Sequence, residues 1–378
     1  MSGIYIHIPF CRQACSYCDF YFVTRKGHRE EFVERLCDEI EFYRETPYRD
    51  QPVETIYFGG GTPSLLRVDE VEKIMERLRE VFQLRLQEVT MEMNPDDVDL
   101  NYLDGLREAG VDRASMGVQS FNPSLLRFMH RAHDSEQADR ALEALCESRF
   151  PTYTADLIYG NPGQSLTDLD RDIDRLLRFD PPHISAYSLT IEPGTRLGRQ
   201  EELGRLRPAD DEAVAAHFNL LGERLSAAGI ERYEISNYSR PGFEALHNTR
   251  YWSHHNYLGL GPSAHSFQWD GQTAERWKVE PDLGRYLSEP FEDLRNEKEQ
   301  LTPEHLAEER IMLSLRTRWG VRREELMERY NYSFSERQQT WLAEKEQEGL
   351  LLQDEAVSLT EQGMLLADHL LVELLARH

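Results

Sequence analysis

Long apolar stretches are missing from this sequence of 378 residues. No run approaches the roughly 18 consecutive apolar residues that a membrane-spanning helix needs, and the mean hydropathy is −0.63. The first residues, Met1 to Ile8, pass directly into a strand pattern, without the basic region and apolar core of a secretory signal. These absences argue against a membrane-spanning protein, and we expect a cytoplasmic one.

Positive charge is also scarce. The chain has 43 Lys and Arg against 68 Asp and Glu, which gives a formal net charge of −25 at pH 7. Binding to nucleic acid or to anionic lipid depends on Lys and Arg side chains that neutralise phosphate groups. The charge therefore disfavours both partners, and we expect no nucleic acid. Its simplest consequence is solubility.

Cysteine is sparse but unevenly placed. Cys11, Cys15 and Cys18 follow the spacing Cys-x3-Cys-x2-Cys, whereas Cys37 and Cys146 stand alone in helical patterns. In a cytosolic chain, clustered cysteines indicate metal or redox chemistry rather than disulfides. Three close thiolates can hold three irons of a cubane cluster and leave the fourth iron without a protein ligand.

Two alternatives to a cluster remain at these cysteines. A structural zinc site needs four ligands, and His7 would have to reach across an awkward distance to be the fourth. A redox pair of the Cys-x-x-Cys type fits Cys15 and Cys18 but leaves Cys11 unexplained. The spacing therefore favours an iron–sulfur cluster.

Strand-like and helical segments alternate through the first two thirds of the chain. The predicted strands cover residues 4–8, 55–58, 88–93, 114–118, 152–158 and 184–189. Such alternation is typical of an α/β fold with a parallel sheet, and right-handed crossovers would curl the sheet into a partial (β/α)6 barrel. An open, doubly wound sheet is the alternative.

Chemically distinctive residues follow the ends of these predicted strands. They are Cys11–Cys18, Gly59–Thr62, Glu92, Gln119 and Asp156. Barrel active sites are built on the rim formed by the carboxyl ends of the strands. The shared position of these residues therefore favours the barrel over the open sheet.

We divide the chain into three parts. A barrel domain is expected over 1–238, an irregular, aromatic-rich connecting region over 239–300, and a mainly helical, winged-helix-like domain over 301–378. The last part predicts two helices, a third helix ending at Gly349, and a short hairpin. Winged helices often bind DNA, but the acidic third helix argues against that here, so we expect a structural cap.

The cysteine motif resembles that of radical S-adenosylmethionine (SAM) enzymes, Cys-x3-Cys-x-aromatic-Cys, with Tyr17 as the aromatic residue. The likeness continues through Tyr5–Cys11, Tyr57–Ser64, Gly117–Phe121 and Asp156–Gly160. These segments are similar, in order and spacing, to the oxygen-independent coproporphyrinogen III dehydrogenases. The resemblance covers about residues 3–378, including the C-terminal part.

The resemblance implies a radical SAM barrel with a [4Fe-4S] cluster on Cys11, Cys15 and Cys18. It also implies that SAM chelates the open iron and is cleaved to a 5′-deoxyadenosyl radical when an electron passes through the cluster. The positions that match the family's SAM contacts are Tyr5, Tyr17, Gly60, Gly61, Thr62, Glu92, Gln119, Arg131 and Asp156. Taken singly, each is also compatible with an ordinary turn or a surface charge.

Two departures from the dehydrogenases change the expected function. Phe20 occupies the position of a further cysteine that the dehydrogenases need for turnover. His247–Trp252 fits His-Asn-x-x-Tyr-Trp, the motif of a sister group, the HemW haem chaperones. That resemblance implies a protein that binds the cluster, SAM and haem and delivers haem to haem-requiring respiratory apoproteins. It further implies an electron donor and transient contact with the membrane.

The chemistry of the motif suits haem. His247 can offer an imidazole to iron, Asn248 can bond a propionate or orient the histidine, and Tyr251 and Trp252 offer flat apolar faces. The rival iron ligands nearby are His254, His255 and His265. The alternative interpretation is that the motif packs the seam beside the barrel.

We therefore expect a haem chaperone more than an enzyme. The second hypothesis is an oxygen-independent coproporphyrinogen III dehydrogenase, which Phe20 opposes. The third is a radical SAM enzyme acting on an unrelated substrate, with the aromatic segment 251–277 as its pocket.

Overall fold

A computed structural model describes residues 3–25 and 27–377 of the chain. Its centre is a twelve-stranded sheet in the order β12-β11-β10-β9-β1-β2-β3-β4-β5-β6-β8-β7. The parallel middle strands are β1 (Gly3–Ile8), β2 (Val53–Gly60), β3 (Leu84–Met93), β4 (Arg113–Gln119), β5 (Thr152–Tyr159) and β6 (His183–Ser188). This run of parallel pairs confirms the predicted partial (β/α)6 barrel.

Helices connect the parallel strands. They are α1 (Arg29–Phe42), α2 (Val68–Val81), α3 (Leu100–Ala109), α4 (Pro123–Phe128), α5 (Ser135–Ser148) and α6 (Leu166–Leu177). Short 3-10 turns lie at Tyr43–Glu45, Pro47–Asp50 and Pro63–Leu65. α7 (Arg196–Glu202) and α8 (Asp211–Ala227) follow β6. Gly110 ends α3 with φ of 105°, a left-handed conformation that glycine adopts without strain.

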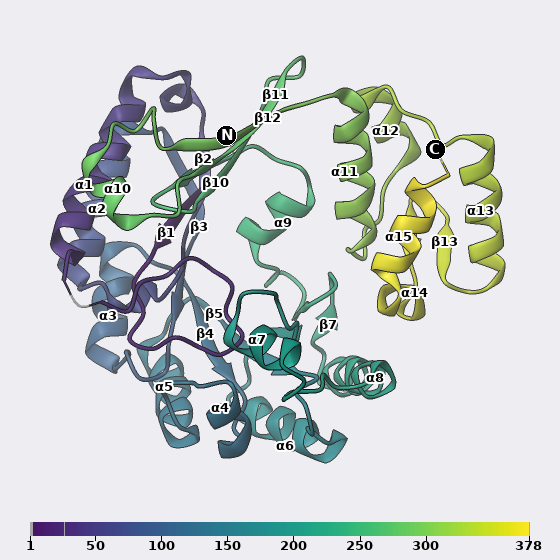
Figure 1. Cartoon of the computed structure of the whole chain (residues 1–378), viewed down its shortest axis with the longest axis horizontal. Helices are drawn as coiled ribbons and strands as arrows, with labels where there is room; N and C mark the ends of the chain where they lie inside the picture. Colours follow the sequence, from purple (N-terminus) through teal and green to yellow (C-terminus); the bar gives the residue numbers. More distant parts are fainter. Residues whose placement is uncertain (1–2, 26, 378) are drawn as a thin grey trace.

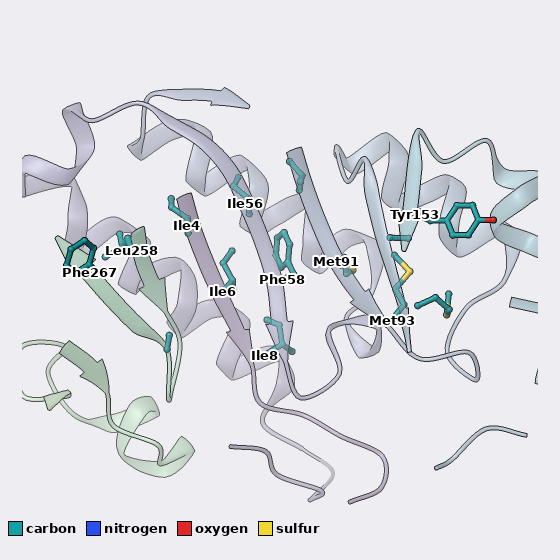
Figure 2. Close-up of a cluster of buried hydrophobic side chains, with 14 of the residues drawn as sticks. Ile4, Ile6, Ile8, Ile56, Phe58, Met91, Met93, Tyr153, Leu258 and Phe267 are labelled. Atoms are coloured by element: carbon teal, nitrogen blue, oxygen red, sulfur yellow. The ribbon is translucent and has the colours of Figure 1, made fainter. Parts of the chain in front are cut away.

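Alternation along β1 separates two environments. Ile4, Ile6 and Ile8 are fully buried in the apolar core, beside Ile56 and Phe58 of β2 (Figure 2). Successive side chains of a strand point to opposite faces, so the residues between these isoleucines face the interior of the barrel. The same alternation in β2 to β6 places polar side chains on the interior face, where a ligand can reach them.

Residues 239–300 are not the irregular connection that we expected. They form α9 (Leu246–Trp252), β9 (Tyr257–Leu260), β10 (His265–Trp269), β11 (Ala274–Val279), α10 (Leu283–Ser288) and β12 (Arg295–Leu301). β9 pairs in parallel with β1, with Gly3 opposite Tyr257, so the sheet continues past the barrel's first strand. Local periodicity could not reveal that β9 joins the sheet, because its partner β1 lies about 250 residues away in sequence. β10, β11 and β12 pair with strands close by in sequence and follow β9 into the sheet.

The other edge of the sheet and the C-terminal part complete the molecule. β8 (Asn237–Ser239) and β7 (Glu231–Arg232) add antiparallel strands beyond β6. The C-terminal elements are α11 (Pro303–Leu315), α12 (Arg323–Tyr330), α13 (Glu336–Gln347), β13 (Leu351–Gln353), β14 (Val357–Leu359), α14 (Glu361–Leu365) and α15 (Ala367–Leu375). Three helices followed by an antiparallel hairpin confirm the winged-helix-like arrangement.

The C-terminal helices lie beside the barrel, with α9 between them and the parallel strands (Figure 1). Arg310 of α11 donates a hydrogen bond to the carbonyl oxygen of Trp252 in α9 at 2.7 Å. The helix that carries the His-Asn-x-x-Tyr-Trp motif therefore contacts the C-terminal part directly. Within the described ranges, none of the helices combines the length and apolar character needed to span a membrane.

Candidate functional site

A cavity of about 490 Å³ opens at the carboxyl ends of the barrel strands. The thiols of Cys11, Cys15 and Cys18, from the loop after β1, all line it. It is also lined by Tyr17, Gly60, Gly61, Thr62, Glu92, Gln119, Arg131 and Asp156. The fold thus gathers the cysteines and eight of the nine positions expected to contact SAM around one space, which we call the cysteine cavity.

The thiols of this cavity are partly buried and lie next to hydrogen-bond donors. The Thr62 hydroxyl donates a hydrogen bond to Cys11 Sγ at 3.4 Å, and Arg131 Nη1 donates one to Cys15 Sγ at the same distance. Burial raises the pKa of Cys11 to about 11 and that of Cys18 to about 12. Since iron binds the thiolate form, loading a cluster would release protons from these groups.

The two remaining cysteines lie elsewhere. Cys37 is buried within α1, and Cys146 is exposed on α5 with its sulfur near the carbonyl oxygen of Phe179. In the part of the chain that the structure describes, no three His, Cys, Asp or Glu side chains converge on a point suited to a single metal ion.

The Arg131 side chain lines the cysteine cavity and makes several hydrogen bonds there. Its Nη2 donates to Asn94 Oδ1 at 2.6 Å and to the carbonyl oxygen of Gly117 at 2.9 Å. Its Nε and the Oε1 atom of Gln119 are buried without a hydrogen-bond partner. Buried polar atoms are normally paired, so both atoms indicate that a polar ligand belongs here. Sequence reasoning missed Asn94, although it directly follows the end of β3, at the rim where it should have been sought.

Two carboxyl groups face the same cavity. Glu92 accepts hydrogen bonds from the Tyr57 hydroxyl at 2.8 Å and from the Gly60 amide at 3.2 Å, and Asp156 accepts one from Ser115 at 3.1 Å. Burial raises the pKa of Glu92 to about 7, with the nearby Asp156 adding to the effect, and raises that of Asp156 to about 6. Two such carboxyl groups favour a ligand that carries positive charge.

The glycines at the end of β2, Gly60 and Gly61, are required by the fold itself. A Cβ on Gly61 would lie 2.8 Å from the carbonyl oxygens of Ile8 and Phe10, and a Cβ on Gly60 would lie 2.6 Å from the His7 ring. Gly60 also has φ of 105°, which other residues adopt only with strain. Close approach of β2 to β1 therefore accounts for these glycines, whether or not a ligand also touches them.

A second cavity, of about 720 Å³, lies between the barrel, α9, the β10–β11 strands and α11. Its walls include the aromatic residues Tyr5, Phe20, Tyr21, Tyr57, Tyr187, Tyr251, Tyr257 and Phe267. The two cavities adjoin, because both are lined by Asp19, Phe20, Tyr57, Glu92 and Tyr187. Phe20, which is 64% exposed, stands at this boundary. We call the second space the aromatic cavity.

Three of the four residues expected to contact haem line the aromatic cavity, and the fourth does not. His247, Asn248 and Tyr251 line the aromatic cavity, whereas Trp252 does not belong to its lining.

One of the expected SAM contacts is also placed differently. Tyr5 lines the aromatic cavity and not the cysteine cavity, and its ring stacks on Tyr57 with 6.0 Å between the ring centroids.

His247 is held on every side. It is 2% exposed, its Nδ1 is 2.8 Å from Thr55 Oγ1, and its Nε2 is 2.8 Å from the Tyr251 hydroxyl. Burial lowers its pKa to about 3, so the ring is neutral. A Cβ on Gly3 would lie 3.1 Å from this ring. These contacts are those of a side chain that packs the seam beside the barrel.

The start of α9 is fixed by a barrel carboxylate. Glu88 of β3 accepts hydrogen bonds from the backbone amides of Leu246 and His247, each at 2.9 Å. These are among the amides at a helix N-terminus that have no partner within the helix. The contact holds the motif in place against the interior of the barrel.

Comparison with known proteins agrees with this architecture. The model of the Radical SAM superfamily matches residues 5–176, and that of the HemN C-terminal domain matches residues 301–366. The heme chaperone HemW of Bacillus subtilis (strain 168) is 35% identical over 376 residues, which cover 97% of each chain. HemW of Lactococcus lactis subsp. lactis (strain IL1403) is 31% identical, covering 97% of this chain and 96% of its own.

The chain belongs to the HemW family. A further relative, the heme chaperone HemW of Escherichia coli (strain K12), is 36% identical over 70% of this chain and 69% of its own. Among solved structures, this HemW family member is similar to coproporphyrinogen III oxidase (HemN) from Escherichia coli, with a TM-score of 0.84 over 98% of this chain and 89% of that one. The identity is 24%, so this likeness establishes the fold alone.

Proposed function

We propose that this protein is a cytoplasmic haem chaperone. It holds a [4Fe-4S] cluster on Cys11, Cys15 and Cys18, binds SAM in the cysteine cavity and haem in the aromatic cavity, and delivers haem to haem-requiring respiratory apoproteins. Delivery to membrane-bound acceptors requires transient contact with the membrane, and the cluster requires an electron donor. The observation that carries the proposal is the pair of adjoining cavities, one lined by three thiols and the other by aromatic rings.

The donor set of the cysteine cavity fits both cofactors. Three thiols supply three cluster ligands, and the fourth iron would be open to SAM. When bound, the cluster and SAM supply one-electron radical chemistry. The unpaired Arg131 Nε suits a carboxylate, the unpaired Gln119 Oε1 suits an amine or hydroxyl donor, and Glu92 with Asp156 suits a cation.

The aromatic cavity fits haem by its size and its walls. Its volume of about 720 Å³ is within the range of about 300–1,000 Å³ typical of small-molecule sites. Flat phenol rings such as Tyr251 and Tyr257 match a planar macrocycle, and Asn248 offers an amide to a propionate. The family name of the curated relatives supports haem as the cargo.

A transfer experiment tests the proposal. The anaerobically reconstituted protein is loaded with haem and mixed with a haem-free respiratory apoprotein, and transfer is followed by the absorption spectrum of the acceptor. Haem-loaded serum albumin serves as the non-specific carrier. We expect faster transfer from this protein than from albumin. Failure to bind haem, or transfer no faster than from albumin, would overturn the proposal.

The dehydrogenase hypothesis needs its own experiment. The cluster-loaded protein receives SAM, a reductant and coproporphyrinogen III, and products are separated by chromatography beside an authentic dehydrogenase. We expect no decarboxylated product, because Phe20 stands at the boundary of the cavities in place of a cysteine. Product at a rate comparable with that of the authentic enzyme would make this chain a dehydrogenase.

A further inference from the structure

Five histidines line the aromatic cavity, and three of them are buried. His247 bonds Thr55 and Tyr251, as described above. His7, which is 3% exposed, has Nε2 at 2.8 Å from the carbonyl oxygen of Tyr21. His254, which is 5% exposed, has Nδ1 at 3.1 Å from the Tyr330 hydroxyl. Its Nε2 lies 3.4 Å from Glu309 and is buried without a hydrogen-bond partner. All three rings are almost completely enclosed, so haem iron cannot reach their nitrogens unless neighbouring side chains move.

His265 differs from these three. It is the first residue of β10, it is exposed, and its ring makes no hydrogen bond or ion pair with any other described residue. The fifth histidine, His255, is half-buried and also lines a separate cleft beside Arg250 and Glu54.

A cation lies directly across from His265. Lys278 of β11 is its partner in the antiparallel register, and its ammonium group pairs with no carboxylate in residues 3–25 and 27–377. Arg276, on the same strand and also lining the cavity, is already paired with Glu309 and Glu299. One wall of the cavity thus carries an exposed imidazole and an unpaired ammonium group. The imidazole can bind the iron of an iron porphyrin, and the ammonium group can bind one of its carboxylate side chains.

We propose that His265 is the protein ligand to haem iron in the aromatic cavity and that Lys278 binds a haem propionate. This assignment rests on the proposed function, since it names the ligand of the haem that the chaperone would carry. His247 is then a positioning residue: through its bond to the Tyr251 hydroxyl and its stack on Tyr57 it fixes two walls of the cavity. The motif acts on haem through these walls and not through an iron–nitrogen bond.

Ferric haem titrations of single variants test the assignment. The full chain and its variants His265→Ala, His247→Gln and His255→Ala are titrated with haemin and followed by absorption and electron paramagnetic resonance spectra. His369→Ala, which changes an exposed histidine of α15, is the matched control for surface ligation. Far-UV circular dichroism verifies that each variant is folded.

We expect the wild-type chain, His369→Ala, His255→Ala and His247→Gln to show the same axial-ligand spectrum. His265→Ala should bind haemin about 10–100-fold more weakly with a changed spectrum, since even partners behind a metal ligand contribute that much to affinity. Added imidazole should restore the wild-type spectrum to His265→Ala, which a purely structural defect would not allow. Lys278→Gln should weaken binding without changing the spectrum.

Two results would overturn the assignment while leaving the proposed function intact. One is an unchanged spectrum and affinity in His265→Ala. The other is loss of the axial-ligand spectrum in His247→Gln or His255→Ala, which would make one of those residues the ligand. If the wild-type chain itself binds no haemin, the proposed function fails, and the assignment fails with it.

Discussion

The imidazole of His247 stacks on the phenol ring of Tyr57, with 5.0 Å between ring centroids and 29° between ring planes. Tyr57 in turn donates its hydroxyl hydrogen to Glu92 at 2.8 Å. His247 of α9 is thereby linked, through Tyr57 of β2, to the Glu92 carboxylate that lines the cysteine cavity. These two contacts join a wall of the aromatic cavity to the polar lining of the cysteine cavity.

Replacing His247 by Ala should destabilise the fold. The substitution removes a ring that is 98% buried and leaves Thr55 and Tyr251 without their shared partner, which costs about 2–4 kcal/mol. Denaturant unfolding followed by circular dichroism measures the difference. His369→Ala, on an exposed helix surface, should stay within about 0.5 kcal/mol of the wild-type chain. A loss equally small for His247→Ala would refute the packing role.

Replacing Tyr57 by Phe should weaken SAM binding. The change keeps the ring stacked on His247 but removes the hydroxyl that donates to Glu92. A buried carboxyl that loses a donor becomes less able to carry the charge that attracts a cation, and we expect about tenfold lower affinity. Isothermal titration of the cluster-loaded protein measures it. Tyr153→Phe, which loses a hydroxyl bonded to the Phe179 carbonyl outside both cavities, is the control. Equal affinities for all three proteins would count against the link.

Replacing Cys11, Cys15 or Cys18 by Ser should abolish the cluster. Each thiol lines the cysteine cavity, and a serine hydroxyl does not replace a thiolate in holding iron. The brown absorbance at about 400 nm should disappear, while the far-UV dichroism stays largely unchanged. Cys37→Ser and Cys146→Ser should retain the absorbance, because both thiols lie outside the cavity. Iron and sulfide retained in the triple variant would show that the ligands are wrongly assigned.

Glu39 should make stability fall as the pH rises. This buried carboxyl of α1 accepts hydrogen bonds from the Tyr286 hydroxyl and the Gly261 amide, and burial raises its pKa to about 7. The unfolded chain loses this proton near pH 4.5, whereas the folded chain keeps it until about pH 7. The unfolding free energy should therefore decrease across that window, on the order of 3 kcal/mol.

The variant Glu39→Gln isolates this effect, because the amide oxygen can accept both hydrogen bonds and carries no titrating proton. Denaturant unfolding at several values between about pH 5 and pH 7 compares the two proteins. The decrease should be smaller in the variant. Parallel slopes would mean that Glu39 titrates alike in the folded and unfolded chains.

Much of this site could be predicted from the sequence. The spacing of Cys11, Cys15 and Cys18 and the positions of Glu92 and Asp156 at strand ends are local properties, and parallel strands bring their carboxyl ends to one rim. Tyr5 was expected beside SAM because its position matches a SAM contact of the family that the sequence resembles. Its side chain instead faces the aromatic cavity, because alternation along β1 and the neighbouring Tyr57 determine where it points.

The sequence by itself determined the six strand–helix units, the cluster of thiols and the presence of a histidine-rich motif, because periodicity and spacing are encoded over a few residues. Only the tertiary structure decided that 239–300 extends the sheet, that the two cavities share Phe20 and Tyr57, and that His247 is enclosed while His265 is exposed. The burial and hydrogen bonding of a side chain depend on residues up to about 250 positions away, and no local pattern records them.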